Sequence, residues 1–242
     1  MIQAIITDIE GTTSSLAFVK DILFPYARNH IADYIRIHEK EPLVQQSLNE
    51  AGKIIGTDLT TEELIHTFIQ WMDEDKKITP LKAIQGLLWE NGYLKGDFKG
   101  HLYEDAVKNL KKWKNLGIKI YVYSSGSIYA QKLLFGYTEY GDLNSIFTDY
   151  FDTHIGAKTS VDSYQRIAAA IAVSPENCLF LSDIKQELDA AHEAGMHTIW
   201  LVRNAKPDPS ADHVQVTDFN AIDLGKLCGK AHEGATINLR KP

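Results

Sequence analysis

The amino-acid sequence predicts an α/β protein with a Rossmann-like parallel sheet core and an inserted all-helical domain. Short apolar runs rich in β-branched residues occur at the start of the chain and again in its second half, where each follows an amphipathic helical stretch. Strands that alternate with helices form parallel sheets covered on both faces. The stretch between these two parts has helical periodicity and no run typical of a strand.

The first predicted strand, Gln3 to Ile9, is apolar and ends where turn residues begin. Apolar residues at three- and four-residue spacing predict helices ahead of or between the later strands, two of them closed by a glycine. The further strands are predicted at Ile118 to Tyr123, Cys178 to Leu181, Thr198 to Val202 and Val214 to Val216, and the helices at Tyr103 to Leu116, Ile128 to Leu134, Ser163 to Ala172 and Glu187 to Ala194.

The middle of the chain is predicted to be a helical cap. Thr60 to Glu63 and the pair Thr79-Pro80 are typical of helix starts. We therefore assign residues 1–14 and 101–242 to the α/β core domain and residues 15–100 to the cap domain. The predicted cap helices are Lys20 to His38, Leu43 to Ile55, Thr61 to Asp73 and Leu81 to Glu90.

The composition excludes several classes of protein. Of the 242 residues, 44% are hydrophobic and 24% charged, as in ordinary globular proteins. The net charge of -7 and the lack of a long Lys/Arg run argue against a nucleic-acid or anionic-membrane partner. Cys178 and Cys228 lie far apart and indicate neither a disulfide framework nor a zinc site. With no signal peptide or membrane-span pattern, we expect a cytoplasmic monomer.

Polar residues follow two of the predicted strands in a way that suits phosphate chemistry. Ligands of parallel α/β sheets bind at the carboxyl ends of the strands. Asp8 and Glu10 follow the first strand, where a desolvated carboxylate indicates cation binding or chemistry, the alternative being a turn that merely ends the strand. Ser124 and Ser125 stand at a strand-to-helix junction, which makes either an anion cradle or an ordinary helix cap.

Three charged residues complete the pattern. Lys158 lies in a polar stretch and would supply fixed positive charge for a phosphate, although without the other motifs a surface lysine would be the preferred interpretation. Asp183 follows the strand at Cys178 to Leu181, and Glu187 lies four residues later. Carboxylates on separate loops suit Mg²⁺, whereas a lone aspartate there would be a helix cap. The joint pattern favours phosphoryl transfer more strongly than any of its parts.

The ordered set Asp8/Glu10, Ser124, Lys158 and Asp183 resembles the four motifs of the haloacid dehalogenase superfamily of phosphohydrolases, over nearly the whole chain. The resemblance implies a haloacid dehalogenase-like core with a cap. The strings DIEGTT, FVKDILFPYA, PLKAIQGLLWENGY, VYSSGS, IFTDYFDTHIGAKTSVDSY and FLSDIKQELDAA are similar to the enolase-phosphatase (acireductone synthase) family of the methionine salvage pathway.

This resemblance implies a role for each acidic residue. Asp8 would be the nucleophile that forms an aspartyl-phosphate. Asp8 and Asp183 would bind one Mg²⁺ per subunit through their carboxylates, and Glu10 through its backbone carbonyl. The Glu10 side chain replaces the Asp of most superfamily phosphatases, which protonates the leaving oxygen and then activates water. Because its carboxyl lies one methylene further out, its partner in proton transfer could differ.

The resemblance also implies how the phosphate is held. Ser124 and Ser125 would bind phosphate oxygens, with Lys158 as the catalytic cation beside them. Glu187 would restrain Lys158 or the metal-bound waters. The implied reaction enolises 2,3-diketo-5-methylthiopentyl 1-phosphate and then hydrolyses its phosphate to leave the acireductone 1,2-dihydroxy-3-keto-5-methylthiopentene. The spacing of the motifs indicates residues for the phosphoryl step, but it identifies no base for the enolisation.

Two other functions remain compatible with these motifs. One is a haloacid dehalogenase-like phosphatase or phosphomutase that acts on another small phosphate ester through the same aspartyl-phosphate. The other is a non-catalytic module that recognises a phosphorylated partner. Intact Asp8, Lys158 and Asp183 argue against the second.

Overall fold

The computed structural model describes residues 1–57, 59–203 and 206–227 and divides the chain into two compact units. One unit contains residues 1–15, 102–126 and the chain from 144 onward, and we call it the sheet unit. The other contains residues 16–101 and 127–143, and we call it the helical unit. Cys228, for which the sequence predicts neither a disulfide nor a zinc site, lies outside the described residues, whereas Cys178 is buried.

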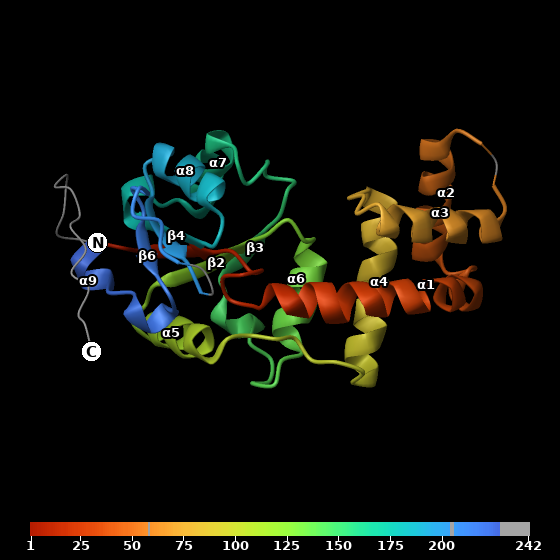
Figure 1. Cartoon of the computed structure of the whole chain (residues 1–242), viewed down its shortest axis with the longest axis horizontal. Coiled ribbons are helices and arrows are strands. Elements are labelled where there is room, and N and C mark those ends of the chain that lie inside the picture. The colour runs from red at the N-terminus through yellow and green to blue at the C-terminus, as the bar shows by residue number, and fades with distance from the viewer. Residues whose placement is uncertain (58, 204–205, 228–242) are drawn as a thin grey trace. The chain divides into compact units, whose positions relative to one another are not determined.

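The sheet unit is built on six parallel strands in the order β3-β2-β1-β4-β5-β6 (Figure 1). This arrangement confirms the predicted Rossmann-like parallel sheet. The central strands are apolar and β-branched, and every residue of β1 and β4 is buried, as expected of strands covered on both faces. The strands are β1 (Ala4–Thr7), β2 (Lys119–Tyr123), β3 (Asp149–Phe151), β4 (Cys178–Ser182), β5 (His197–Leu201) and β6 (Val214–Val216).

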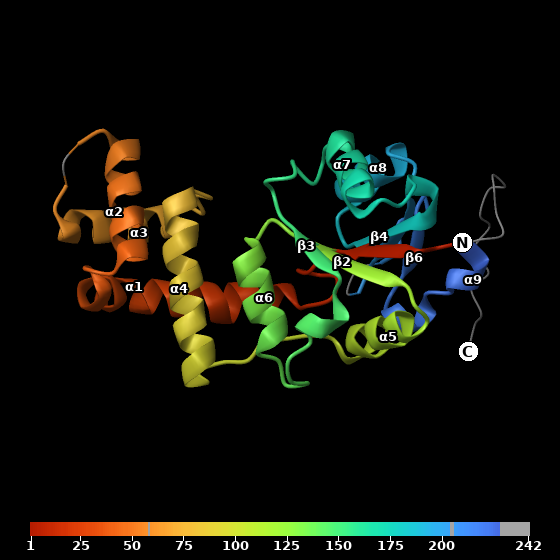
Figure 2. The same cartoon turned by 180° about the vertical axis from the view of Figure 1, so that it is seen from behind.

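Helices cover both faces of the sheet. Figure 2 shows α7 and α8 on one face and α5 on the other, as Figure 1 does from the opposite side. Ala4 and Ile6 of β1 belong to the core cluster that includes Tyr164 of α7 and Leu188 of α8. The helical segments of this unit are α5 (Glu104–Asn115), η2 (Asn144–Ile146), α7 (Val161–Ile171), η3 (Pro175–Asn177), α8 (Lys185–Glu193), η4 (Phe219–Ala221) and α9 (Leu224–Leu227).

The helical unit has its own apolar core. Ile31, Val44, Phe68 and Ile84, from four different helices, belong to a single buried cluster. As predicted, Thr60 begins α3 with a capping box, in which Thr60 and Glu63 exchange side-chain and backbone hydrogen bonds. The helices are η1 (Phe18–Leu23), α1 (Phe24–His38), α2 (Pro42–Ile55), α3 (Thr61–Asp73), α4 (Thr79–Lys95) and α6 (Ile128–Gly136).

The helix α6 packs with the helical unit, although the sequence analysis placed its residues in the core domain. Gly100 lies so close to α6 that a Cβ atom on it would be 2.1 Å from the carbonyl oxygen of Leu134. Tyr93 of α4 stacks on Tyr137, with ring centroids 5.5 Å apart. The predicted cap of residues 15–100 therefore matches one compact unit apart from residues 127–143, and the assignment of functional domains stays a prediction.

One strand and several short helical segments escaped the sequence analysis. The strand β3 has only three residues, which is too short for periodicity to show. It lies at the edge of the sheet, where it pairs with β2 alone, and its first residue, Asp149, is exposed. The short α9 near the end of the described chain was also not predicted. Among the described residues, no helix is both long and apolar enough to cross a bilayer.

Candidate active site

Three predicted site residues lie at the same edge of the sheet because the strands that carry them are parallel neighbours. Asp8 follows β1, Ser124 follows β2 and Asp183 follows β4. Thr7 at the end of β1 is in register with Val122 on one side and Leu181 on the other. In strand order 3-2-1-4, the chain proceeds from β1 to β2 and β3 on one side and then returns to β4 on the other side of β1, and ligands of α/β sheets bind at such a switch point. Asp8 stands at this point.

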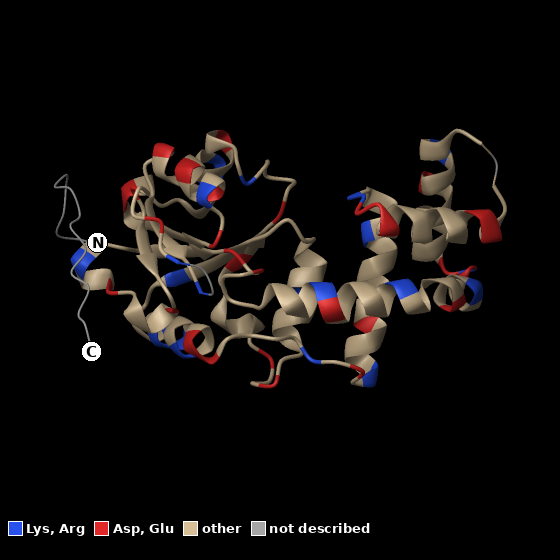
Figure 3. Cartoon of the chain, in the orientation of Figure 1, with Lys and Arg blue, Asp and Glu red and all other residues tan. Residues whose placement is uncertain are grey.

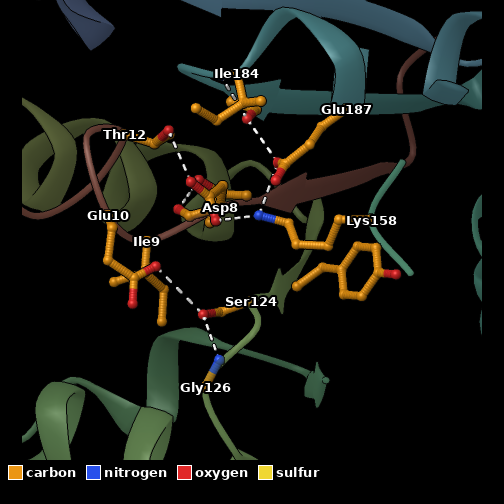
Figure 4. A network of polar contacts seen from close by, with 12 residues as sticks. Asp8, Ile9, Glu10, Thr12, Ser124, Gly126, Lys158, Ile184 and Glu187 are labelled. Carbon is orange, nitrogen blue, oxygen red and sulfur yellow. Dashed lines mark hydrogen bonds and ion pairs between the residues drawn. The ribbon is translucent and has the colours of Figure 1, made fainter. Parts of the chain in front are cut away.

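Lys158 lies between two carboxylates in the sheet unit (Figure 4). Its Nζ forms an ion pair with Oδ1 of Asp8 and another, 2.7 Å long, with Oε2 of Glu187. The three side chains are between 3% and 12% exposed, so this charge cluster is largely removed from water. Burial lowers the pKa of Lys158, but the charges of Asp8 and Glu187 outweigh burial and raise its pKa overall. Lys158 is therefore a permanent cation.

Glu187 is fixed from two directions. It receives the Lys158 ion pair and a hydrogen bond of 2.9 Å from the hydroxyl of Ser182. Burial and the negative charge of Asp8 raise the pKa of Glu187, while Lys158 and Ser182 oppose this rise. Glu187 thus restrains Lys158 directly, which is one of the two roles that the resemblance implied.

The loop after β1 holds the nucleophile candidate. The backbone N–H of Asp8 donates to the carbonyl of Leu181 at 2.9 Å, and the hydroxyl of Thr12 donates to Asp8 Oδ2 at 3.3 Å. Gly11 has a φ of +80° and lies against Asp183, so that a Cβ atom there would be 2.1 Å from the Asp183 carboxylate. Only glycine fits this position, because a side chain would collide with the carboxylate and strain the backbone.

Asp183 has the features of a cation ligand. Its Oδ1 atom is buried without a hydrogen-bond partner among the described residues. Burial, followed by the charges of Asp8 and Glu187, raises the pKa of Asp183 to about 7. The indole N–H of Trp200 donates to its backbone carbonyl at 2.8 Å and holds this residue in place. An unpaired buried carboxylate oxygen is costly unless a cation binds it.

The residues present fit Mg²⁺, which binds through few carboxylates together with water and substrate oxygens. No group of three or more His, Cys, Asp or Glu side chains in the described chain is arranged to hold a metal by itself. The predicted set is consistent with this finding, because it contains only two carboxylates, Asp8 and Asp183, and the Glu10 carbonyl. The unpaired Asp183 oxygen is the observation that favours a metal here.

Glu10 points its carboxyl toward the loop after β2. Ser124 donates from its hydroxyl to Glu10 Oε2 at 3.3 Å and accepts a bond of 3.1 Å from the N–H of Gly126 (Figure 4). Burial and the charge of Asp8 raise the pKa of Glu10. A raised pKa favours the protonated form of a carboxyl, which is the form that a general acid requires. Ser125, the other predicted phosphate ligand, is exposed beside this loop.

Arg203 lies beside the loop after β1 and was missed by the sequence analysis. Its Nε donates to the carbonyl of Thr12 at 2.8 Å, and its other nitrogens form two bonds, of 3.1 and 2.9 Å, with the carboxylate of Asp105. Its guanidinium lies 3.8 Å from the ring centroid of Tyr103. One signal could have found Arg203, since it directly follows the predicted strand at Thr198 to Val202.

Comparisons with known proteins agree with this geometry. The model of the haloacid dehalogenase-like hydrolases matches residues 2–195. Enolase-phosphatase E1 of Thioalkalivibrio sulfidiphilus is 53% identical over 224 residues, which cover 93% of this chain and 100% of that protein. Enolase-phosphatase E1 of Yersinia enterocolitica is 52% identical over 225 residues, or 93% of this chain and 98% of that protein.

Solved structures show the same fold. The crystal structure of the Unknown transcript 4 protein from Saccharomyces cerevisiae aligns with a TM-score of 0.79 and 32% identity, covering 92% of this chain and 100% of that one. The haloacid dehalogenase of Xanthobacter autotrophicus aligns with a TM-score of 0.57 at 16% identity and covers 96% of this chain and 100% of that chain, which supports the fold alone. With its nucleophile candidate at the switch point of the sheet, the chain belongs to the haloacid dehalogenase-like hydrolases and, within them, to the enolase-phosphatase family.

Proposed function

We propose that the chain is an Mg²⁺-dependent enolase-phosphatase that converts 2,3-diketo-5-methylthiopentyl 1-phosphate to 1,2-dihydroxy-3-keto-5-methylthiopentene and phosphate in methionine salvage. The observation that carries this proposal is the buried cluster of Asp8, Lys158 and Glu187 beside the unpaired oxygen of Asp183. The identity of 53% and 52% to two enolase-phosphatases over nearly their whole length supports the substrate.

Asp8 acts as the nucleophile in the phosphoryl step. One of its carboxylate oxygens forms a bond to phosphorus while the bond between phosphorus and the substrate's oxygen breaks. Thr12 and Lys158 hold the carboxylate by contacts with its two different oxygens, so its orientation is fixed before the substrate binds. Lys158 offers its positive charge to the transferring group as negative charge develops there.

Glu10 moves the proton. In its protonated form it gives the proton to the departing oxygen, and as a carboxylate it then takes a proton from the water that hydrolyses the aspartyl-phosphate. Its raised pKa and the hydrogen bond from Ser124 support this role, because the first favours the protonated form and the second fixes the direction of the carboxyl. Ser124 and Ser125 stand at the loop that would bind phosphate oxygens.

The same end of the sheet serves both halves of the reaction. When bound through Asp8, Asp183 and the Glu10 carbonyl, Mg²⁺ would stabilise negative charge both on an enediolate and on a phosphoryl group. Lys158 offsets part of the negative charge of Asp8 and Glu187.

The test is to incubate the purified protein with the diketo phosphate and Mg²⁺ while phosphate release and the enediolate absorbance are followed together. We expect wild type with Mg²⁺ to give both signals. The Asp8→Asn variant, and wild type without Mg²⁺, should release no phosphate. Phosphate release with no enediolate signal would instead indicate a phosphatase of another small ester. Equal phosphate release by wild type and Asp8→Asn would rule out the nucleophile.

We also propose one Mg²⁺ per subunit and a monomeric enzyme. Asp183 Oδ1 is the one buried carboxylate oxygen without a hydrogen-bond partner in the described part of the chain, which supports the stoichiometry. Native mass spectrometry in Mg²⁺-containing buffer measures both quantities, and a second bound Mg²⁺ or a dimer mass would contradict the corresponding proposal.

A further inference from the structure

Three consecutive backbone carbonyls around Lys158 each accept a hydrogen bond from a buried hydroxyl. Tyr123 donates to the carbonyl of Gly156 at 3.0 Å, Ser163 to that of Ala157 at 2.7 Å, and Tyr164 to that of Lys158 itself at 2.7 Å. The three donors are at most 1% exposed. We call Tyr123, Ser163 and Tyr164 the hydroxyl cradle.

The hydroxyl cradle is rigid because its members belong to regular elements. Tyr123 is the last residue of β2, and Ser163 and Tyr164 are in the first turn of α7. The rings of Tyr123 and Tyr164 pack edge to face with centroids 5.7 Å apart, and Tyr164 packs in the same way on Phe180 of β4 at 5.0 Å. Their hydroxyls therefore have fixed positions relative to the sheet edge where Asp8 lies.

The segment that the cradle holds has no regular structure of its own. Residues 152–160 are connected by tight turns, such as the bond of 3.0 Å from the N–H of Ser160 to the carbonyl of Ala157. Gly156 has a φ of +142°, and a Cβ atom on it would lie 2.2 Å from the Ser163 hydroxyl. The segment thus approaches α7 as closely as glycine permits.

A lysine side chain is long and flexible, so the place of its ammonium depends on where its backbone is held. Lys158 must reach Asp8 and Glu187 together, and both of these are fixed by other contacts. We propose that Tyr123, Ser163 and Tyr164 are positioning residues, which hold the Lys158 backbone so that its ammonium meets Asp8 and the transferring phosphoryl group. The kinetic test of this proposal rests on the proposed phosphoryl transfer, whereas the placement of the Lys158 backbone rests on the three hydrogen bonds alone.

The variant that tests the proposal most cleanly is Tyr164→Phe, which removes one oxygen and keeps the ring. We expect kcat to fall about tenfold while KM changes less than about twofold, because a displaced ammonium costs most where charge develops. Ser163→Ala, which removes the neighbouring donor, is expected to act in the same direction and serves as a second variant if Tyr164→Phe folds poorly.

Tyr150→Phe is the matched control. Tyr150 is also buried in the sheet unit, and its hydroxyl donates to Asn144 Oδ1 at 2.7 Å, so its removal costs a similar hydrogen bond that does not touch the Lys158 segment. We expect Tyr150→Phe and Tyr164→Phe to lower the melting temperature by similar amounts, and only Tyr164→Phe to lower kcat.

The assay separates this proposal from the proposed function. Each variant is measured with the diketo phosphate and with p-nitrophenyl phosphate, a general phosphate ester, and its affinity for inorganic phosphate is measured by calorimetry in the presence of Mg²⁺. If wild type fails on the diketo phosphate alone, the substrate is wrong while the cradle is still tested on the other two probes. Inorganic phosphate reports ground-state binding, so we expect its affinity for Tyr164→Phe, like KM, to change less than about twofold. A kcat within twofold of wild type in both Tyr164→Phe and Ser163→Ala, or an equal loss of kcat in Tyr150→Phe, would overturn the proposal.

Discussion

The sheet unit and the helical unit differ in whether the ion pairs compared below are buried or exposed. In the sheet unit, Lys158 and Arg203 have side chains only 10% and 9% exposed and are paired with carboxylates that are also largely buried. In the helical unit, Arg28 and Asp73 form a comparable bidentate pair with both side chains about half exposed. Figure 3 shows Lys, Arg, Asp and Glu along the helices of the helical unit, whose core cluster is apolar.

This difference shows where the protein contains charged groups whose removal from water lowers its stability. Desolvating an ion is expensive, and a buried pair seldom recovers more than that cost. An apolar core such as that of the helical unit is the cheaper solution for stability alone. Buried charges in the sheet unit are therefore expected where the proposed chemistry requires them, at Asp8 and Lys158, and where the loop after β1 must be held, at Arg203.

The largest effect is expected for Lys158→Met. The substitution leaves Asp8 and Glu187 buried without their counter-charge, so we expect kcat to fall roughly a thousandfold and the free energy of unfolding to fall by about 3 kcal/mol. Steady-state kinetics and urea denaturation measure the two changes. Lys76→Met is the control from the helical unit, since Lys76 is paired with Glu74 but nearly half exposed. Similar losses in both variants would break the comparison between the units.

The two arginine pairs sharpen the comparison further. Arg203→Met is expected to cost about 3 kcal/mol in the free energy of unfolding because it leaves Asp105 buried and unpaired. Arg28→Met, from the exposed pair, should hardly change it. Urea denaturation of both variants at neutral pH provides the measurement, and an equal change in the two would contradict the role of burial.

The Arg203 deficit should also depend on pH. Burial raises the pKa of Asp105, but Arg203 and the N–H of Phe219 outweigh this and lower it below its usual value of 3.8. A carboxylate with a lowered pKa in the folded state contributes stability above its unfolded pKa and loses it as the pH falls through the folded value. The difference between wild type and Arg203→Met should therefore shrink below pH 3.8, and a constant difference across that range would argue against an ionic origin.

Asp183→Asn should stabilise the protein when no metal is present. The pKa of Asp183 is raised from 3.8 to about 7, so the folded state disfavours the ionised form and stability declines as the pH rises between these values. At pH above 7 the variant should gain about 2 kcal/mol, roughly half of the full conversion of this shift because solvent screens the partly exposed side chain, and the gain should vanish below 3.8. Thermal melts with a chelator measure this gain. Added Mg²⁺ should then stabilise wild type more than the variant, and identical Mg²⁺ titrations would contradict the ligand role.

The smallest effect is expected at the start of α3, in the helical unit. Thr60→Ala removes the capping hydroxyl and should lower the free energy of unfolding by about 1 kcal/mol, whereas Thr60→Ser keeps the hydroxyl and should cost much less. Hydrogen exchange along α3 localises the change. If exchange rose equally in the two variants, the capping box would have no energetic role.

Much of the fold could be predicted because its signals are local. The strands at Ala4–Thr7 and Cys178–Ser182 are short, β-branched or apolar, and buried on both faces, so their composition differs from that of any helix around them. The strand β3 could not be predicted, because three residues carry no usable period and its place is decided by pairing with β2. The packing of α6 with the helical unit likewise depends on contacts with α4 that are distant in sequence.

The candidate site likewise has a part that the sequence could predict and a part that it could not. The sequence by itself determined which residue types end each strand, and the parallel order of the strands then brings Asp8, Ser124 and Asp183 to one edge. Only the tertiary structure decided that Lys158 lies between Asp8 and Glu187, that Ser124 holds Glu10, and that Arg203 and the hydroxyl cradle support the loops. The reason is physical: strand ends follow from local propensity, whereas these contacts join residues far apart in the chain and exist only once the sheet has folded.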